Sequence, residues 1–314
     1  MDARSNSVGA VVVTFNRKNF LERVLDSLLA QSRPVDHIYV IDNASTDGSA
    51  EYLSSLNNPR ISVRRLPTNT GGAGGFSCGM KWAFDAGHEW IWMMDDDVAQ
   101  TARCLEMLLT ANTTARILLP LARAFDDGRH LAGLATRLNL TSPFTPGFRL
   151  KIAARLYPTI ESMPAVVRIE DLSFEGPLIH RSVPETVGFP RAEFFISYDD
   201  TEYGIRAAKS HLGPIVLVRD AVMKRLNDAS SVSPLWRSYY QCRNDLIVRT
   251  GRWAHPLMRI RVRSMFVLRT ILGRLTGKEP LKTTRVRIHA FFDSLPGRPL
   301  INRYLPDSIV TPEH

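Results

Sequence analysis

Residues 8–15 read VGAVVVTF, and this apolar run decides the fold of the chain. A run without polar alternation is typical of a strand that is buried on both faces of a parallel sheet. Apolar residues then recur at helical spacing over residues 20–31, and a second apolar run, IYVI, occupies residues 38–41. Strand, helix and strand in this order predict a parallel α/β arrangement.

The alternation continues for the first hundred residues. We expect a third strand at residues 61–66, a helix at 79–86 after a glycine-rich loop, and a fourth strand at 90–94 (WIWMM). The sequence therefore predicts the α/β class, with a Rossmann-like, mostly parallel sheet flanked by helices. Ligands bind such sheets at the carboxyl ends of the strands.

The net charge of +9 is unevenly distributed over the 314 residues. Residues 1–100 carry 9 basic and 12 acidic side chains, whereas residues 251–314 carry 12 basic and 4 acidic ones. A uniformly basic chain would suggest a nucleic-acid partner, but one basic end suggests a single specialised surface. We predict a catalytic domain over residues 1–250, a basic helical extension over 251–314, and no nucleic-acid partner.

Cysteine usage and the chain ends favour a cytoplasmic protein. Cys78, Cys104 and Cys242 form no closely spaced pair, so neither a disulfide framework nor a zinc site is expected. Residues 1–7 are polar and do not read as a signal peptide. No stretch approaches the roughly 18 apolar residues that a spanning helix needs.

Polar residues and glycines follow the second and third predicted strands. Asp42 and Asn43 can accept hydrogen bonds from a ribose or a base, or can instead form a capped turn. Residues 69–75, NTGGAGG, let backbone N–H groups approach a phosphate, unless they form only a flexible surface loop.

Carboxylates follow two further apolar segments. Asp95, Asp96 and Asp97 end the fourth strand, and alternate residues of an extended segment share a face. Asp95 and Asp97 can therefore hold one Mg²⁺ or Mn²⁺ ion, although an acidic helix start is the alternative. Asp199 and Asp200 follow the segment EFFISY and can act as a general base or as helix caps.

In their order and spacing these features resemble the family 2 inverting glycosyltransferases of the GT-A fold. The bacterial galactofuranosyltransferases are the more similar group within that family. The resemblance runs from about residue 8 to residue 250 and rests on four motifs: NTGGAGGF at 69–76, MDDDV at 94–98, YDDTEYGIRA at 198–207 and YYQCRN at 239–244.

The resemblance implies a role for each matching residue. Asp95 and Asp97 would bind the metal, Asp200 would be the general base with Asp199 beside it, and Asp42 and Asn43 would lie near the uridine. The substrate-binding residues expected in full are Thr14, Asp42, Asn43, Asn69, Gly71, Gly72, Gly74, Gly75, Asp96, Lys224, Trp236 and Arg243.

One position departs from the galactofuranosyltransferases. A histidine that completes their metal site is matched here by Lys224, which is either a cation for the diphosphate or a solvated surface residue. Three arrangements are then open: the metal is held by two protein carboxylates plus water, or Asp228 takes the place of the histidine, or the enzyme depends only weakly on the metal. We hypothesise the first. Trp236 can stack on an acceptor sugar or simply pack in the protein.

The basic extension contains an amphipathic stretch at residues 252–276. Its apolar residues recur at three- or four-residue steps, with arginines between them. It can lie on an anionic membrane or pack on the core, and the enzyme interpretation favours the membrane. The apolar residues are Leu257, Ile260, Leu268, Ile271 and Leu275, reinforced by Met265 and Phe266, and the arginines are Arg259, Arg263 and Arg274.

We therefore expect a metal-dependent, inverting transferase on the inner face of the cytoplasmic membrane. It would move galactofuranose from UDP-galactofuranose to a polyprenyl-diphosphate-linked or other glycan acceptor during cell-envelope polysaccharide synthesis. A rhamnosyltransferase using a dTDP-sugar is the alternative enzyme. A non-catalytic nucleic-acid-binding protein is the alternative from another class, but acidic strand ends would repel phosphate.

Overall fold

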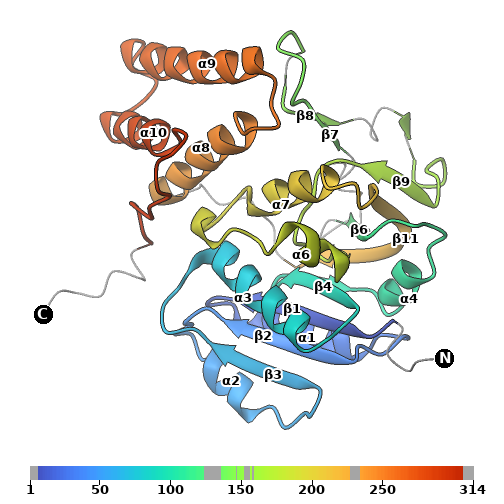
Figure 1. The fold of residues 1–314 in the computed structure, drawn as a ribbon. Coiled ribbons are helices and arrows are strands. Elements are labelled where there is room, and N and C mark those ends of the chain that lie inside the picture. The colour runs from blue at the N-terminus through green and yellow to red at the C-terminus, as the bar shows by residue number, and fades with distance from the viewer. Residues whose placement is uncertain are drawn as a thin grey trace, which may run out of the picture.

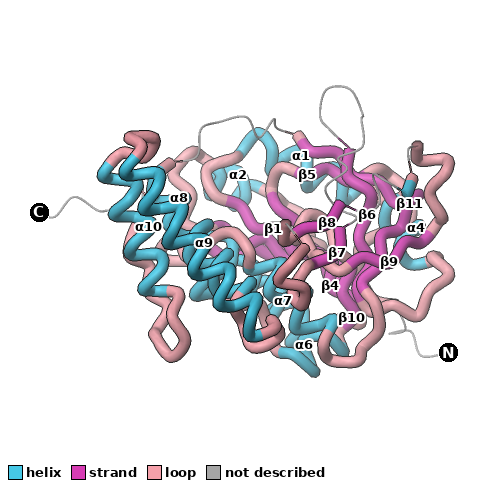
Figure 2. The backbone as a smooth tube through the Cα atoms, turned by 90° about the horizontal axis from the view of Figure 1, so that it is seen from above, coloured by secondary structure: helices cyan, strands magenta, loops and turns pink. Residues whose placement is uncertain are grey.

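The computed structural model describes residues 6–123, 136–145, 147–151, 156–157, 159–226 and 234–306. Its main body is a twisted sheet with helices on both faces, and three C-terminal helices stack at one end of that body (Figure 1). The same three helices lie together at one end when the molecule is seen from above (Figure 2).

The first half of the sheet follows the predicted alternation. Its four strands are parallel and lie in the order β3-β2-β1-β4. The elements are β1 (Val8–Thr14), α1 (Lys18–Leu29), β2 (His37–Asp42), α2 (Ser49–Ser55), β3 (Ile61–Arg65), α3 (Gly71–Asp85) and β4 (Trp90–Asp95).

The second half makes the sheet mixed. Strand β10 (Leu178–His180) runs antiparallel between β4 and β6 (Ile117–Arg123). Strand β11 (Ile215–Arg225) pairs parallel with β6 and antiparallel with β5 (Val98–Gln100) and β9 (Val166–Ile169). The α/β class is confirmed, and the parallel character is strongest over the first hundred residues.

Shorter elements complete the body around this sheet. Of these, α7 and η1 contribute to the functional site. They are α4 (Cys104–Leu109), α6 (Ser182–Val187), the 3-10 helix η1 (Ala192–Phe194), α7 (Asp199–Ala208), and a small sheet of β7 (Thr136–Leu138) and β8 (Arg149–Lys151).

Strand β1 is buried on both faces, as the run VGAVVVTF predicts. Val11 and Val13 belong to the apolar core that includes Met80 of α3, whereas Val12 belongs to the core on the opposite face with Leu25 of α1. Fully burying one such side chain contributes about 1.5–3 kcal/mol, so this strand anchors both layers.

The glycine-rich segment forms the first turns of α3, which corrects the predicted loop before a helix at residue 79. The helix begins at Gly71. A Cβ atom at Gly75 or Gly79 would collide with the side chain of Val13 or Val11. These glycines therefore let α3 lie close against β1, and a loop could not provide that packing.

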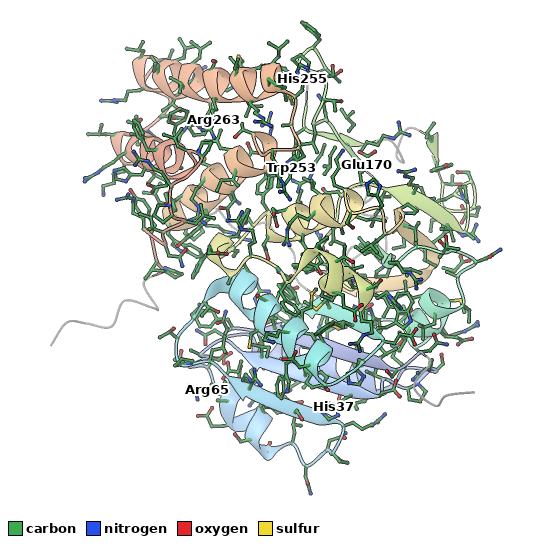
Figure 3. The ribbon with its side chains drawn as sticks, in the orientation of Figure 1. His37, Arg65, Glu170, Trp253, His255 and Arg263 are labelled. Carbon is green, nitrogen blue, oxygen red and sulfur yellow. The ribbon has the colours of Figure 1, made fainter. Side chains whose placement is uncertain are left out.

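Helices α8 (Leu235–Arg249), α9 (Pro256–Leu275) and α10 (Leu281–Asp293) form the C-terminal group. Arg263 lies on the inner side of α9 (Figure 3), where its guanidinium donates to the Thr250 hydroxyl and to the Ser294 carbonyl. The amphipathic helix is thus confirmed, but Arg263 points inward.

The apolar stripe of α9 faces outward. Among the described residues, no helix has both the length and the hydropathy needed to cross a membrane. The core-packing alternative does not hold for this stripe, because all five residues that define it are exposed: Leu257, Ile260, Leu268, Ile271 and Leu275.

Candidate functional site

The carboxyl ends of three neighbouring strands meet at one edge of the sheet. Thr14 at the end of β1 pairs with Asp42 at the end of β2, and Val13 pairs with Asp95 at the end of β4. The loop after η1 and the first turn of α8 lie against this edge, since residues of both line the same cavities.

Two adjoining cavities open at this edge. The acidic cavity, about 400 Å³, is lined by Asp95, Asp97, Glu175, Asp199 and Asp200 together with arginines. The asparagine cavity, about 340 Å³, is lined by other predicted residues. They are Thr14, Asn43, Asn69, Gly71, Gly72, Asp96 and Trp236. The residues that line both cavities are Arg17, Gly72, Asp95, Ile196 and Arg237.

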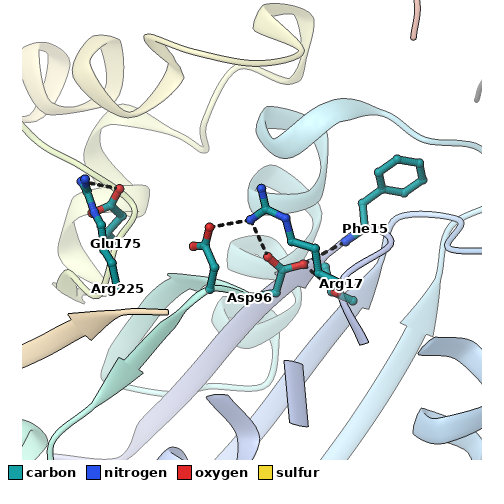
Figure 4. A network of polar contacts seen from close by, with 7 residues as sticks. Phe15, Arg17, Asp96, Glu175 and Arg225 are labelled. Carbon is teal, nitrogen blue, oxygen red and sulfur yellow. Dashed lines mark hydrogen bonds and ion pairs between the residues drawn. The ribbon is translucent and has the colours of Figure 1, made fainter. Parts of the chain in front are cut away.

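Asp96, the middle residue of the acidic triplet, faces inward. Its carboxylate accepts hydrogen bonds from the Thr14 hydroxyl at 2.8 Å and from the Phe15 amide at 3.1 Å. Arg17 donates to both Asp96 and Asp97, at 3.1 and 2.5 Å (Figure 4). Burial raises the pKa of Asp96 to about 6, although Arg17 opposes the shift.

Asp95 lies where negative charge is most concentrated. Burial raises its pKa well above the ordinary carboxyl value, and Asp97, Asp96 and Glu175 raise it further. Glu175 is itself paired with Arg225, which donates three hydrogen bonds of 2.7, 2.8 and 2.9 Å (Figure 4). Crowded carboxylates of this kind ionise readily only beside a cation.

The donor chemistry of this edge suits a hard divalent cation. Asp95 and Asp97 line the acidic cavity and offer carboxylate oxygens, the ligands that Mg²⁺ and Mn²⁺ prefer. Within the described residues, no three His, Cys, Asp or Glu side chains are grouped to hold a metal. The carboxylates of Asp95 and Asp97 are therefore the donors at this edge that a divalent cation could use.

Asp199 and Asp200 face the same cavity from the first turn of α7. Burial raises the pKa of Asp199 to about 6. Burial also raises the pKa of Asp200, and Asp199 and Asp171 raise it further. Tyr198 is the N-cap residue of α7, so neither aspartate fills the capping position.

The loop before α7 has an unusual backbone that buried side chains hold in place. Phe195, Ser197 and Tyr198 have φ values of 62°, 67° and 67°, which costs about 1–3 kcal/mol at each residue. Asn244 donates 2.9 Å hydrogen bonds to three carbonyls of this loop, and Arg243 donates to two carbonyls at its start. Arg243 is fully buried and lines neither cavity, so it positions the loop and does not face a substrate.

Asn43 and Asn69 organise the start of α3. The Asn43 amide donates to the Gly71 carbonyl at 2.9 Å and accepts from the Thr70 amide at 2.8 Å. Asn69 accepts from the Gly71 amide at 2.8 Å. Gly71 has a φ of +74°, and a Cβ atom there would collide with the Phe195 carbonyl. This glycine therefore lets the loop and the helix start meet.

Besides Arg243, four expected residues lie outside the two cavity linings. Asp42 is buried and accepts from the Ser45 amide, and its other oxygen lies 3.5 Å from Arg65, which is labelled in Figure 3. Gly74 faces Thr70, and Gly75 faces Val13.

Lys224, the fourth of these residues, is exposed on β11. Its exposure agrees with the alternative of a solvated surface residue, and alternation along the strand brings its neighbour Arg225 into the acidic cavity. Trp236 lines the asparagine cavity and also packs edge-on against Phe195. Asp228 lies outside the described residues.

Four charged residues of the acidic cavity were absent from our sequence-based list: Arg17, Glu175, Arg225 and Arg237. A signal existed for Arg17, because a cation two residues beyond a buried strand must lie near the carboxylates that end the neighbouring strand. Glu175 comes from a turn before β10, which no local pattern marked.

Residues 10–160 match the family model described as Glycosyl transferase family 2. The chain is also 33% identical over 213 residues to the galactofuranosyltransferase GlfT1 of Mycobacterium tuberculosis, a match that covers 66% of this chain and 66% of that protein. The chain belongs to glycosyltransferase family 2.

Two further comparisons bear on this transferase. It is 22% identical over 312 residues to the dTDP-rhamnosyl transferase RfbF of Shigella flexneri, covering 93% of this chain and 97% of that protein. A crystal structure of GalNAc-T7 with UDP, GalNAc and Mn²⁺ superimposes with a TM-score of 0.56 at 13% identity, covering 88% of this chain and 58% of the other. The GT-A fold of the transferase is thereby confirmed.

Proposed function

We propose that this transferase moves galactofuranose from UDP-galactofuranose to a hydroxyl of a glycan acceptor. The observation that carries the proposal is that two pairs of aspartates line one cavity. Asp95 and Asp97 form one pair, and Asp199 and Asp200 form the other. The similarity to a galactofuranosyltransferase supports the choice of donor.

The asparagine cavity is the proposed seat of the nucleotide. Asn43, Asn69 and the exposed backbone of Gly72 offer donors and acceptors beside the helix start of α3, where positive dipole ends favour phosphate. Asp42 accepts a hydrogen bond from the Ser45 amide and so supports the turn that carries Ser45. Arg237 lines both cavities and is placed to pair with the diphosphate between them.

Asp95 and Asp97 are the proposed ligands of an Mg²⁺ or Mn²⁺ ion. When bound, such a cation neutralises the charge that develops on the leaving diphosphate. Arg17, Arg225 and Arg237 line the same cavity and add positive charge to it.

Asp200 is the proposed general base. The acceptor oxygen bonds to the anomeric carbon as the bond from that carbon to UDP breaks, and Asp200 takes the hydroxyl proton. Attack from the face opposite the leaving group inverts the anomeric configuration. The raised pKa of Asp200, caused by burial and then by Asp199, suits a base that must hold the proton it receives.

The outer face of α9 and α10 is the proposed contact with an anionic bilayer, where a polyprenyl-diphosphate-linked acceptor would be held. We call this the apolar face, and charge complementarity supports the assignment. Its exposed apolar side chains are Leu257, Ile260, Leu268, Ile271, Leu275, Leu281, Ile288 and Phe292. The exposed charged side chains of these helices and their connection, within the described residues, are all basic: Arg269, Arg274, Lys278, Lys282 and Arg285.

A groove between α9 and α10 adds to this face. It encloses about 400 Å³ and is lined by apolar side chains, including Phe266, Ile271, Leu275 and Phe292, together with Arg274 and Arg287. An apolar lining with basic side chains in it suits acyl chains below phosphate headgroups. A peripheral position on the inner face of the cytoplasmic membrane follows from this proposal.

A donor screen tests the proposed reaction. Wild-type protein and Asp200→Asn are incubated with UDP-galactofuranose, other UDP-sugars or dTDP-rhamnose and a polyprenyl-diphosphate glycan acceptor, in the presence of Mn²⁺. We expect transfer from UDP-galactofuranose by the wild type alone. Transfer from dTDP-rhamnose instead would favour the RfbF-like alternative, which the match along nearly the whole chain supports.

A further inference from the structure

Arg17 occupies the position between the carboxylates of Asp96 and Asp97. One guanidinium nitrogen reaches both, at 3.1 and 2.5 Å, from the loop that joins β1 to α1 (Figure 4). Burial disfavours the charge of Arg17, but Asp96, Asp97 and Asp95 outweigh it, and the pKa of Arg17 is raised. The arginine thus forms ion pairs with two of the three carboxylates of the acidic triplet.

The backbone around Arg17 is held firmly. Asn16 has a φ of 54°, its amide donates to the Ser45 hydroxyl at 3.0 Å, and its side chain accepts from the Thr46 amide at 2.7 Å. The side chain of Arg17 is nevertheless 42% exposed. A fixed backbone with a half-exposed guanidinium lets the charged group change partners while the loop stays in place.

Asp97 is therefore a partner for two different cations. Our proposed function makes it a ligand of the divalent ion, and in this structure it pairs with Arg17. The two cations share one carboxylate, because Arg17 Nη1 contacts an oxygen of Asp97 that a metal bound by this side chain would also attract. Arg17 lines both cavities, so a guanidinium that leaves Asp97 remains beside the proposed diphosphate seat.

We propose that Arg17 is the internal counter-cation of the acidic triplet and competes with the divalent metal for Asp97. Arg17 keeps the carboxylates compensated before the metal arrives. Arg17 would leave Asp97 when a divalent ion binds there, and its guanidinium would then be free to pair with a diphosphate oxygen. Metal and nucleotide consequently bind better together than separately. The inference rests on the proposed metal role of Asp95 and Asp97.

Mn²⁺ binding to the purified full-length protein, measured by electron paramagnetic resonance without nucleotide, tests this competition. Arg17→Met is expected to bind Mn²⁺ about tenfold more tightly than wild type, since a charge-assisted hydrogen bond no longer has to be broken. Arg65→Met is the matched control, because it removes one positive charge beside Asp42 and leaves the triplet untouched. Its Mn²⁺ affinity should equal that of the wild type.

A second measurement covers the coupling and guards against misfolding. UDP should tighten Mn²⁺ binding in wild type at least about fivefold, and this factor should fall towards one in Arg17→Met. Arg17→Lys, which keeps the charge on a shorter and more flexible side chain, should lie between the two in both measurements. A melting curve of each variant confirms that it is folded.

The proposed competition would be overturned if Arg17→Met bound Mn²⁺ only as tightly as wild type, or more weakly. Absence of binding by every variant would overturn it too. Transfer activity in the presence of a chelator would then show whether the proposed reaction survives without the metal. Tight Mn²⁺ binding by Arg17→Met alone would support the competition most strongly.

Discussion

The sheet edge and the apolar face of α9 and α10 are both unfavourable for the folded protein alone, but for opposite reasons. At the sheet edge, Asp95, Asp96, Asp199 and Asp200 are charged groups at positions where burial disfavours their charge. On the apolar face, side chains such as Leu275, 77% exposed, meet water. Each arrangement is unfavourable for folding alone, which points to a ligand at the first region and a partner surface at the second.

The two regions also differ in how arginine is used. Arg17 and Arg225 face the carboxylates of the sheet edge and compensate them. Arg259 and Arg263 of α9 turn inward instead and donate to backbone carbonyls and side-chain hydroxyls. Inward arginines leave the outer side of α9 free for leucine and isoleucine. Reactive chemistry and surface attachment are therefore separable, and the following changes test that separation.

Asp200→Asn is expected to have the largest effect. Removing the general base should lower kcat by about 10²–10⁴-fold. Single-turnover transfer from UDP-galactofuranose measures this loss, and vesicle binding of the same variant should stay at the wild-type level. Full transfer by Asp200→Asn would remove this residue as the base.

Gly71→Ala should disrupt the sheet edge through packing. The new Cβ would meet the Phe195 carbonyl at a positive φ, so we expect a loss of at least about 3 kcal/mol in the free energy of unfolding. Gly72→Ala is the matched control, because the nearest atom to its Cβ would be 3.9 Å away. Urea titrations that give equal stability for both variants would contradict the close meeting of α3 and the Phe195 loop.

Ile271→Ser combined with Leu275→Ser should weaken only membrane attachment. Two side chains that are half or mostly exposed in water would no longer be buried in lipid, which costs about 2–3 kcal/mol, or roughly 30- to 150-fold in binding to anionic vesicles. Sedimentation with vesicles measures this change, and Val63→Ser on β3 provides the control at the far end of the molecule (Figure 1). Unchanged vesicle binding would show that the apolar face serves another purpose.

The smallest effect concerns pH and stability. The pKa of Asp199 is about 6 in the folded protein, above its ordinary value, so the folded state holds this proton more tightly than the unfolded state. The contribution of Asp199 to the free energy of unfolding is therefore fully present at low pH and is lost as the pH rises through about 6. From pH 4.5 upward this loss is about 2 kcal/mol. Asp199→Asn should remove that part of the decline, which urea unfolding at pH 4.5 and 6.5 would detect.

The sequence predicts strand ends well because their signal is local. Apolar runs that stop at Asp42 and Asp95 show where strands end, and parallel pairing then brings those ends together. Side-chain direction is harder to predict, as Lys224 and Arg225 show, because one residue of register exchanges the exposed and the inward side chain. Arg243 was misjudged for a related reason: its buried partners are carbonyls fifty residues away.

One factorial assay tests the separation of chemistry and attachment most directly. Wild type, Asp200→Asn and the Ile271→Ser/Leu275→Ser variant each receive UDP-galactofuranose with the same glycan acceptor, either on a short soluble chain or on a polyprenyl diphosphate in anionic vesicles. We predict that Asp200→Asn fails with both acceptors, whereas the double variant equals wild type with the soluble acceptor and falls at least about tenfold with the vesicle acceptor. Equal losses of the double variant on both acceptors would contradict the separation of the two regions.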